Sequence, residues 1–392
     1  MALNILLTCE DYFPVIGGAE VCVHNLKKSY EKSGHRVTLV TNTTDTMPDD
    51  DASIIRIAWR FTPVQLWRHV RLLWRLIGTH DIVHCQYSFR LACVCAVIAF
   101  LRRKPMVLTQ QGRGIVPEVH PKLHHAALAA LCRFLSLKGA AVITSTSEEI
   151  SILTARYVPR ERIIDITNGY DAQTFAPDPS IAVPPEYALL SDTTNIILTV
   201  RRLVPKNAIH ILVQALAVLK ERSLDFHYFA VGDGRMRSII EELIRTHHLQ
   251  NHVTLLGKRG NDTLRVYYQH SDVVIVPSSA EATSIACIEA MGMRKPIIAS
   301  RVGGLIDLLQ RDEQFGTLVD LYDTEACSYD APMTLPREKL ELLADAIEGV
   351  FTDPVSAQVK ADAAYAHVKG AYSWDAIAQR YLTLYDQALT RS

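Results

Sequence analysis

The stretch Val273–Met291, VVIVPSSAEATSIACIEAM, carries the pattern that decides the fold. Four consecutive β-branched residues, Val273–Val276, predict a short buried strand. The small hydroxyl residues Thr283 and Ser284 then predict the start of a helix, because their side chains can accept hydrogen bonds from its free N–H groups. A buried strand that passes through a loop into a helix is the repeating unit of a parallel α/β sheet.

Two acids, Glu281 and Glu289, flank this predicted helix start. On a helix eight positions make a little over two turns, so Glu289 lies on nearly the same face as Glu281. We therefore expect Glu281 in the loop at the mouth of a cleft and Glu289 deeper along it. The free N–H groups and the positive dipole end of a helix suit a bound phosphate group. The alternative is an ordinary surface helix with two solvated glutamates, and the pair alone does not decide between them.

Apolar runs that resemble strands alternate with helical patterns along the whole chain. In the first half the predicted strands are Leu3–Thr8, Arg36–Thr41, Ser53–Ala58, Asp81–His84, Met106–Thr109, Ala140–Thr144 and Ile163–Thr167. In the second half they are Asn195–Val200, Phe226–Val231, Val253–Leu256, Val273–Val276, Ile297–Ser300 and Thr317–Asp320. Two series of this kind predict two parallel α/β domains, since 392 residues are too many for one core.

A turn-rich segment separates the two series and contains Pro177, Pro179, Pro184 and Pro185. We therefore expect a first domain over residues 1–178, a linker over 179–194 and a second domain over 195–370, followed by a last helix over 371–392. Ligands of doubly wound sheets bind beyond the carboxyl ends of the strands, so the loops that follow the strands are the candidate site.

The composition excludes several classes of protein. A formal net charge of −1 gives no global field that attracts nucleic acid. The eight cysteines include no C-x-x-C spacing, which favours buried reduced thiols over a metal or redox site. The first residues predict a strand and not an export signal, and the apolar run Leu91–Leu101 is too short to span a bilayer. We expect a cytoplasmic protein.

Glycines, amides and cations follow several of the predicted strands. Gly17 and Gly18 open a helix after the first strand, where a ligand can approach the backbone closely. Gln111 follows the fifth strand and offers hydrogen bonds to sugar hydroxyls. Arg202 and Lys206 follow the first strand of the second half, where a guanidinium and an ammonium can neutralise a departing diphosphate. Each loop alone is also compatible with an ordinary turn or a solvated surface.

In their order and spacing these segments resemble the family 4 retaining glycosyltransferases of the GT-B fold. The matching segments are Gly17–Glu20, Gly34–Val37, Asp81–His84, Asn168–Asp171, Arg202-Leu203 with Lys206, Gly232–Gly234, Pro277-Ser278, the pair Glu281 and Glu289, and Val302–Gly304. The resemblance implies two Rossmann-like doubly wound domains that face each other across a cleft, with the last helix crossing back to the first domain.

The resemblance also implies an activity and the residues that carry it. Arg202 and Lys206 would bind the donor diphosphate, Glu281 would face the donor sugar, and Glu289 would bind the ribose. Further donor contacts would come from Gly17, Gly18, Gln111, Gly232, Thr283, Ser284 and Ile285. The implied reaction moves a hexosyl unit from a UDP- or GDP-linked sugar with retention, and it needs no metal and no separate cofactor.

Three positions depart from the family pattern. Gln111 stands where many relatives have histidine, and Arg201 and Asn207 stand where glycine is common. The run Ala282–Ser284 replaces the commoner glycine-aromatic-glycine sequence. The change at Gln111 removes a side chain that titrates near neutral pH, and the changes at Arg201 and Asn207 can reshape the phosphate loop.

A predicted helix rich in tryptophan and arginine is the candidate for the side of the protein that meets the acceptor. The stretch 57–77 contains Trp59, Trp67 and Trp74 together with Arg60, Arg68, Arg71 and Arg75. A helical projection places Leu66, Trp67, Val70, Leu73, Trp74 and Ile77 on one stripe. From residue 52 to 117 one acid, Asp81, stands against ten lysines and arginines.

Two interpretations of this helix remain open. Tryptophan beside arginine is typical of an interfacial membrane helix, with Trp67, Arg71, Trp74 and Arg75 on the membrane and acceptor side. The alternative is a core helix with a basic edge, which Leu72 and Leu76 outside the stripe favour. In the first case the acceptor is a lipid-linked saccharide or glycolipid, and the protein lies on the inner face of an anionic membrane.

Two other functions compete with a glycosyltransferase that builds a surface glycan. One is a non-catalytic subunit that binds a sugar nucleotide, which the departures at Gln111 and Arg201 favour. The other is a sugar-nucleotide epimerase on the same architecture, which would convert the donor without an acceptor.

Overall fold

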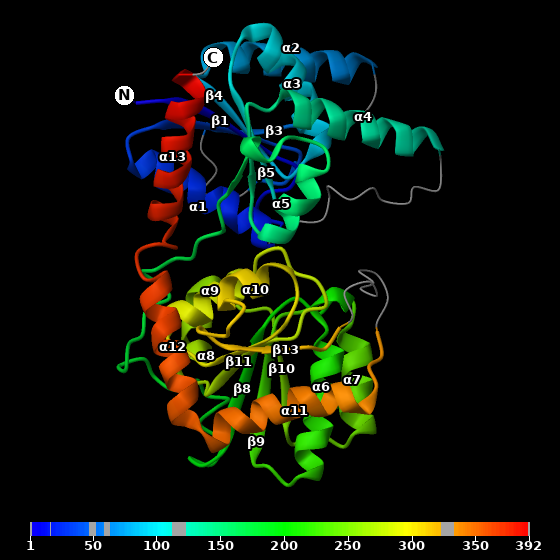
Figure 1. Ribbon diagram of the computed structural model, residues 1–392, viewed down its shortest axis with the longest axis vertical. Coiled ribbons are helices and arrows are strands. Elements are labelled where there is room, and N and C mark those ends of the chain that lie inside the picture. Colours follow the sequence, from blue (N-terminus) through cyan, green and yellow to red (C-terminus); the bar gives the residue numbers. More distant parts are fainter. Residues whose placement is uncertain are drawn as a thin grey trace. The chain divides into compact units, whose positions relative to one another are not determined.

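The computed structural model describes residues 2–15, 17–46, 52–58, 63–111, 123–322 and 333–390. The chain divides into two compact units, which are treated separately below. Unit 1 comprises residues 1–169 and 374–392, and unit 2 comprises residues 170–373. Each unit contains one parallel sheet with helices packed on both faces (Figure 1). This is the α/β architecture that the alternation of strands and helices predicts.

Unit 1 has a seven-stranded sheet within the described residues, in the order β3-β2-β1-β4-β5-β6-β7. Its elements are β1 (Asn4–Cys9), α1 (Gly18–Lys32), β2 (Arg36–Thr41), β3 (Ile54–Arg56), α2 (Pro63–Thr79), β4 (Ile82–Gln86), α3 (Phe89–Arg102), β5 (Met106–Gln110), α4 (Leu123–Gly139), β6 (Val142–Ser145), α5 (Glu148–Ala155), η2 (Arg160–Arg162), β7 (Ile163–Asp165) and α13 (Trp374–Thr390). The strand order reverses between β1 and β4, which are neighbours.

Unit 2 has a six-stranded sheet within the described residues, in the order β10-β9-β8-β11-β12-β13. Its elements are β8 (Asn195–Val200), η3 (Pro205–Asn207), α6 (Ile209–Glu221), β9 (Phe226–Val231), α7 (Arg237–Thr246), β10 (Val253–Gly257), α8 (Asn261–Gln269), β11 (Val273–Val276), α9 (Ile285–Gly292), β12 (Ile297–Ser300), α10 (Gly303–Leu309), β13 (Thr317–Val319), α11 (Arg337–Thr352) and α12 (Pro354–Val368). Here the order reverses between β8 and β11.

The sheet of unit 2 is apolar on both faces, because helices cover both. Ile197 and Tyr228 point into one apolar cluster, whereas Leu198 and Phe229, one residue later on the same strands, belong to the other. Side chains alternate between the faces of a strand, so a strand covered on both sides needs an uninterrupted apolar run. This is why all thirteen predicted strands could be found from short apolar runs, and each is confirmed to within a few residues.

Residues 179–194, expected as a linker, belong to unit 2, and so do residues 170–178. Tyr187 in this segment is buried, and its ring centroid lies 4.2 Å from that of Phe229. The prolines of the segment prevent regular secondary structure, but they do not prevent an aromatic side chain from packing on the sheet. Composition therefore identifies the irregular backbone and misses the packing.

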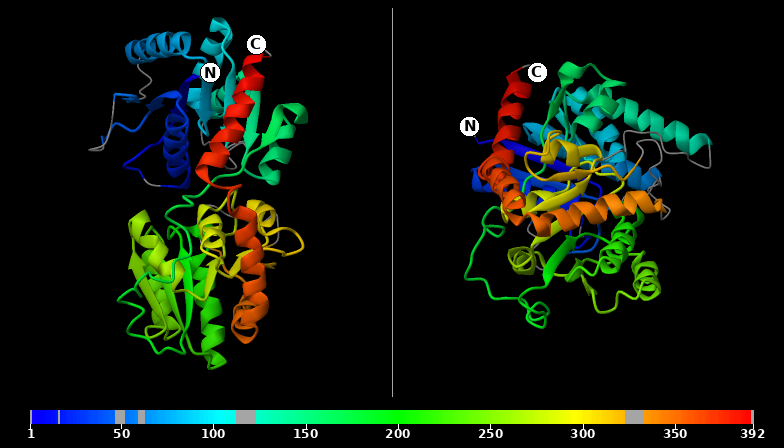
Figure 2. Two further views of the ribbon diagram at one scale, coloured as in Figure 1. Left: turned by 90° about the vertical axis from the view of Figure 1, so that its left-hand side faces the viewer. Right: turned by 60° about the horizontal axis from the view of Figure 1, so that its bottom comes forward.

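The last helix, α13, lies along α1 in unit 1 (Figures 1 and 2). Asp375 at its start accepts hydrogen bonds from Ser29 (2.9 Å) and Lys32 (2.5 Å) of α1. Further along, the hydroxyl groups of Tyr385 and Tyr30 are 2.9 Å apart and fully buried. The helix therefore belongs to the first unit although the chain reaches it from the second, as the resemblance implies.

A buried polar network connects α13 to the strand ends of unit 1. Nδ1 of His84 contacts the Tyr385 hydroxyl, and Nε2 lies 3.0 Å from the amide nitrogen of Gln86. An amide nitrogen can only donate, so Nε2 accepts and Nδ1 carries the proton. Burial lowers the pKa of His84 to about 3, which keeps the ring neutral at physiological pH. Thr109 and Tyr381 extend the network across the sheet.

Replacing Tyr385 with phenylalanine should destabilise unit 1 by about 1–3 kcal/mol, because His84 and Tyr30 would each keep a buried polar group without its partner. Chemical denaturation measures the change in the free energy of unfolding, and amide hydrogen exchange shows whether α13 is less protected. Tyr157→Phe is the matched control, since Tyr157 is exposed at the surface of the same unit. Equal stability of the two variants would contradict this account of the network.

Candidate active site

The site of unit 2 forms where the strand order reverses, because the loops after β8 and β11 leave the same edge of the sheet in neighbouring positions. The backbone N–H and the hydroxyl of Ser279 both donate to the carbonyl of Lys206, at 2.8 and 3.2 Å. The N–H of Gly304, in the first turn of α10, donates to the carbonyl of Glu281 at 2.9 Å. Two loops and the start of α10 are thus joined by hydrogen bonds.

Two glycines after β9 let the loop after β8 pack closely against them. A Cβ atom on Gly232 would lie 2.0 Å from the carbonyl oxygen of Arg201, and one on Gly234 would lie 2.4 Å from that of Leu203. Gly232 also has a φ of +136°, which side chains disfavour. The structure therefore gives Gly232 a packing role that fixes the position of the loop carrying Arg201 and Arg202.

Arg201 lies at the centre of the site and forms an ion pair with Glu281. The same guanidinium donates to the hydroxyls of Ser284 (2.8 Å) and Ser278 (2.7 Å) and to the side-chain oxygen of Asn207 (3.0 Å). The side chains of Arg201 and Glu281 are each 9% exposed, so solvent screens this pair weakly. The sequence identified Arg201 as a departure from the family pattern and not as a site residue.

Lys206 and Arg202 complete the charged cluster of this loop. Burial lowers the pKa of Lys206, Glu281 raises it, and Arg201 and Arg202 lower it. The loop that carries Arg202 and Lys206 is joined to the loop that carries Glu281 by the hydrogen bonds from Ser279 to Lys206 and by the ion pair between Arg201 and Glu281. Arg202 is exposed, whereas Lys206 is partly buried. The structure therefore places Arg202, Lys206 and Glu281 on adjoining loops, and these are the residues to which the resemblance assigns the donor diphosphate and the donor sugar.

Helix α9 starts at Ile285, so it includes Glu289 but not Glu281. Ser284 is its N-cap and accepts a hydrogen bond from the N–H of Cys287 at 3.2 Å. The prediction that Thr283 and Ser284 begin a helix is confirmed at Ser284. The expectation that Glu281 lies in the loop and Glu289 deeper along the helix is confirmed, so the two carboxylates do not share a face of one helix. Because Ser284 caps the N-terminus of α9, the conformation of the preceding loop sets the direction of the Glu281 side chain.

Glu289 lies deeper, in the second turn of α9, and is buried. It accepts a hydrogen bond from the Tyr268 hydroxyl at 3.0 Å. Burial raises the pKa of Glu289 to about 8, the Tyr268 hydrogen bond lowers it, and the nearby Asp171 raises it. Without a ligand this carboxyl is therefore largely protonated at neutral pH. Tyr268 is a site residue that the sequence did not reveal, since a single tyrosine in a helix carries no distinctive pattern, whereas Asp171 lies in one of the segments that carry the resemblance.

The predicted site residues Gly17, Gly18 and Gln111 belong to unit 1. Gly17 is the N-cap of α1, and a Cβ atom there would lie 2.4 Å from a carboxylate oxygen of Glu20. The amide nitrogen of Gln111 donates to Gln86 at 2.8 Å, and Gln86 in turn contacts His84. Gln111 thus ends the buried network that starts at Tyr385. The neighbouring Gly112 and Arg113 lie outside the described residues.

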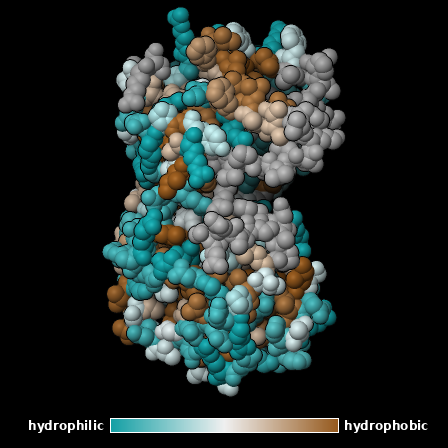
Figure 3. All heavy atoms as spheres, turned by 45° about the vertical axis from the view of Figure 1, so that its right-hand side comes forward, coloured by the Kyte–Doolittle hydropathy of each residue, from teal (hydrophilic) through white to brown (hydrophobic). Residues whose placement is uncertain are grey.

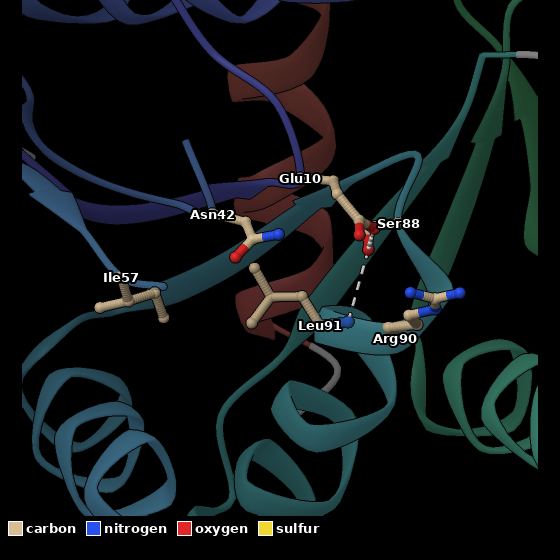
Figure 4. A pocket seen from close by; sticks show the side chains of 6 residues that line it. All are labelled: Glu10, Asn42, Ile57, Ser88, Arg90 and Leu91. Carbon is tan, nitrogen blue, oxygen red and sulfur yellow. Dashed lines mark hydrogen bonds between the residues drawn. The ribbon is translucent and has the colours of Figure 1, made fainter. Parts of the chain in front are cut away.

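A small cavity lies near the strand reversal of unit 1, between β1 and β4. It is lined by Glu10, Asn42, Ile57, Ser88, Arg90 and Leu91, and the Ser88 hydroxyl donates to Glu10 at 2.6 Å (Figure 4). Its volume of ≈ 10 Å³ has room for about one water molecule. Sugar-sized ligands need a few hundred Å³, so this cavity is not a sugar site.

The apolar stripe that the helical projection predicts on α2 is partly buried and partly exposed. Leu73 and Ile77 are fully buried in the core, whereas Trp67 is 60% and Trp74 is 40% exposed. Arg71 lies over the ring of Trp67, and Arg102 of α3 lies over the ring of Trp74. Trp59, Arg60 and the side chain of Leu66 lie outside the described residues. The helix is therefore part of the core and at the same time presents tryptophan and arginine to solvent.

Within the described residues, no helix combines the length and the hydropathy that crossing a bilayer requires. Nor do the residues of these ranges form a group of three or more histidine, cysteine or acidic side chains placed to hold a metal ion.

Replacing Glu289 with glutamine should raise the melting temperature relative to the unchanged protein, and by more at high pH than at low pH. Between the ordinary pKa of 4.5 and the folded value of about 8, the folded state binds more protons than the unfolded state, so stability falls as the pH rises. Thermal unfolding at about pH 5 and about pH 9 tests this. Glu338→Gln, at an exposed position in α11, is the control. A rise in the melting temperature of Glu289→Gln that does not depend on pH would contradict the raised pKa of Glu289.

Comparisons with known proteins agree with this geometry. The family described as "Glycosyltransferase Family 4" matches residues 16–174, and that described as "Glycosyl transferases group 1" matches residues 186–330. N-acetyl-alpha-D-glucosaminyl L-malate synthase of Bacillus anthracis is 25% identical over 355 residues, which cover 87% of this chain and 89% of that protein.

Solved structures show the same fold over the full length of the chain. Sucrose-phosphate synthase of Thermosynechococcus elongatus superposes with a TM-score of 0.78 at 23% identity, and covers 100% of both chains. HepE of Anabaena, solved in complex with UDP-glucose, superposes with a TM-score of 0.76 at 21% identity, again over 100% of both chains. The chain therefore belongs to the family 4 glycosyltransferases and has the GT-B fold.

Proposed function

We propose that the protein is a retaining, metal-independent glycosyltransferase that moves a hexosyl unit from a uridine or guanosine diphosphate sugar to an acceptor in surface glycan synthesis. One observation carries the proposal: Arg202, Lys206 and Glu281 lie together where the strand order of unit 2 reverses, with Glu289 deeper in α9. A doubly wound sheet binds its ligand at this position, and the two cations suit a diphosphate.

In the proposed reaction, Arg202 and Lys206 stabilise the diphosphate as it leaves. The bond between the sugar carbon and the phosphate oxygen breaks, the acceptor hydroxyl oxygen bonds to the same face of that carbon, and a phosphate oxygen takes the hydroxyl proton. The negative charge that develops on the leaving group is what the cations must offset. Glu281 orients the donor sugar and does not act as a nucleophile.

Glu289 is proposed to bind the ribose of the donor. Ribose hydroxyls that donate to Glu289 would favour its ionised form, which burial disfavours in the free protein. The neighbouring Tyr268 hydroxyl already donates to one carboxylate oxygen and leaves the other for a ligand. The structure of HepE with UDP-glucose supports testing a uridine nucleotide first.

The acceptor is proposed to be lipid-linked, because an apolar and basic surface extends over three helices of unit 1. On α2 it contains Trp67, Arg71, Trp74 and Arg75; on α3 and its C-cap it contains Val97, Phe100, Leu101, Arg102 and Arg103; and on α4 it contains Leu128, Leu131 and Phe134. In Figure 3 hydrophobic atoms gather in the upper part of the view, over the unit that carries these helices. Apolar side chains bordered by arginine match the cytoplasmic face of an anionic membrane.

Changing both Arg202 and Lys206 to alanine should lower the rate of sugar transfer by roughly a hundredfold or more, because the diphosphate would leave without its counter-charges. Product formation is measured with UDP- and GDP-sugars over a panel of lipid-linked and soluble acceptors. Arg245→Ala, an exposed arginine of α7, is the control.

The same assay separates the competing functions. Donor binding by the unchanged protein without turnover over the whole panel would indicate a non-catalytic subunit. Conversion of the donor without any acceptor would indicate an epimerase. Equal activity of the double variant and the control would contradict the proposed catalytic role.

Changing Trp67 and Trp74 to alanine together with Arg71 and Arg75 to glutamate should release the protein from anionic liposomes without unfolding it. Each basic residue near an anionic membrane contributes about 1 kcal/mol to binding. Co-sedimentation with vesicles that contain phosphatidylserine measures the change. The control changes Val355 and Val359 to alanine and Arg237 and Arg245 to glutamate, all on the surface of unit 2. Equal sedimentation of both forms would exclude this surface.

A further inference from the structure

We infer that Arg201 is a positioning residue that cancels the charge of Glu281, so that the donor diphosphate meets two uncompensated cations instead of one. The inference rests on the proposed function and adds a residue that the family pattern does not supply, since glycine is common at this position. It follows from three observations in unit 2: the contacts of the guanidinium, the charge count of the loop, and a buried donor atom without a partner.

The contacts hold the guanidinium from three directions. Asn207 belongs to the loop after β8, Ser278 and Glu281 belong to the loop after β11, and Ser284 caps α9. Each of these residues accepts a hydrogen bond from Nη1 or Nη2 of Arg201. A guanidinium that is fixed in this way also fixes the Glu281 carboxylate, because a planar fork binds its acceptors at defined directions.

The charge count gives the pair its consequence for the donor. Arg201, Arg202 and Lys206 carry three positive charges against the one negative charge of Glu281, which leaves two. The diphosphate of a sugar nucleotide carries one negative charge on each phosphate, so the site and the ligand balance. With glycine at position 201 the carboxylate would offset one of the two remaining cations. Because Glu281 is largely buried, solvent would screen its repulsion of the diphosphate poorly.

Nε of Arg201 is the third observation. It is buried and has no hydrogen-bond partner among the residues that the structure describes. Moreover, Nη1 lies against the N-cap of α9, where a positive charge is disfavoured by the helix dipole. Both features favour an anion close to this guanidinium. Glu281 supplies this negative group.

The alternative is that Arg201 only holds the loops together. The two roles predict opposite results when Glu281 is also changed. If Arg201 acts by cancelling the charge of Glu281, then removing the carboxylate restores diphosphate binding to a variant that lacks the arginine. If Arg201 acts by packing, then the second substitution removes a further contact and makes binding worse or leaves it unchanged.

The test is a double-mutant cycle with Arg201→Met, Glu281→Gln and both changes together, titrated calorimetrically with UDP and with GDP. Arg201→Met should weaken binding by about tenfold to a hundredfold, since it leaves a buried carboxylate unpaired beside the ligand. The double variant should bind within about threefold of the unchanged protein. Arg201→Lys keeps the positive charge but loses the planar guanidinium, so its affinity for the nucleotides should lie between those of the unchanged protein and Arg201→Met. This variant remains informative if Arg201→Met does not fold.

The outcomes separate this inference from the proposed function. Equally weak binding by Arg201→Met and the double variant, or unchanged binding by Arg201→Met, would overturn the inference alone. If Arg201→Met does not fold, Arg201→Lys combined with Glu281→Gln takes the place of the double variant. Failure of the unchanged protein to bind either nucleotide would overturn the proposed function and this inference with it.

Discussion

The reversal of strand order between β8 and β11 is the constraint on which the site of unit 2 depends. The chain leaves β8 toward a helix on one face of the sheet, α6, and leaves β11 toward a helix on the other face, α9. Backbone hydrogen bonds from Ser279 to Lys206 and from Gly304 to Glu281 then hold the loops at a fixed spacing. The charged side chains are brought together because the topology brings their loops together.

The two glutamates of this site have different environments and therefore different chemistry. Glu281 is paired with Arg201 in the loop, whereas Glu289 lies in α9 beside the Tyr268 hydroxyl. The first forms an ion pair with a guanidinium. The pKa of the second is raised by burial, so it gains its charge most readily when a ligand donates hydrogen bonds to it. Two residues of one type thus differ in their chemistry, as the two separate roles proposed for them require.

Unit 1 repeats the topology with different contents. Its reversal point, between β1 and β4, is surrounded by polar and acidic side chains and by glycines, and a buried network connects Gln111 through Gln86 and His84 to Tyr385. Helix α13 supplies that tyrosine although the chain reaches it after all of unit 2. Such long-range pairing joins the two ends of the sequence in one fold, and the neutral state of His84 keeps the network uncharged.

The sequence by itself determined the positions of the thirteen strands, the division into two α/β units and the charged loop residues Arg202, Lys206 and Glu281. Short apolar runs bounded by turn residues are local signals, and a resemblance in order and spacing is a property of the linear chain. What only the tertiary structure decided is which groups meet: Arg201 with Glu281, Tyr268 with Glu289, and Tyr187 with Phe229. It also decided that Leu73 and Ile77 are buried while Trp67 faces solvent. These outcomes depend on contacts between residues far apart in the chain, and neither composition nor periodicity records such contacts.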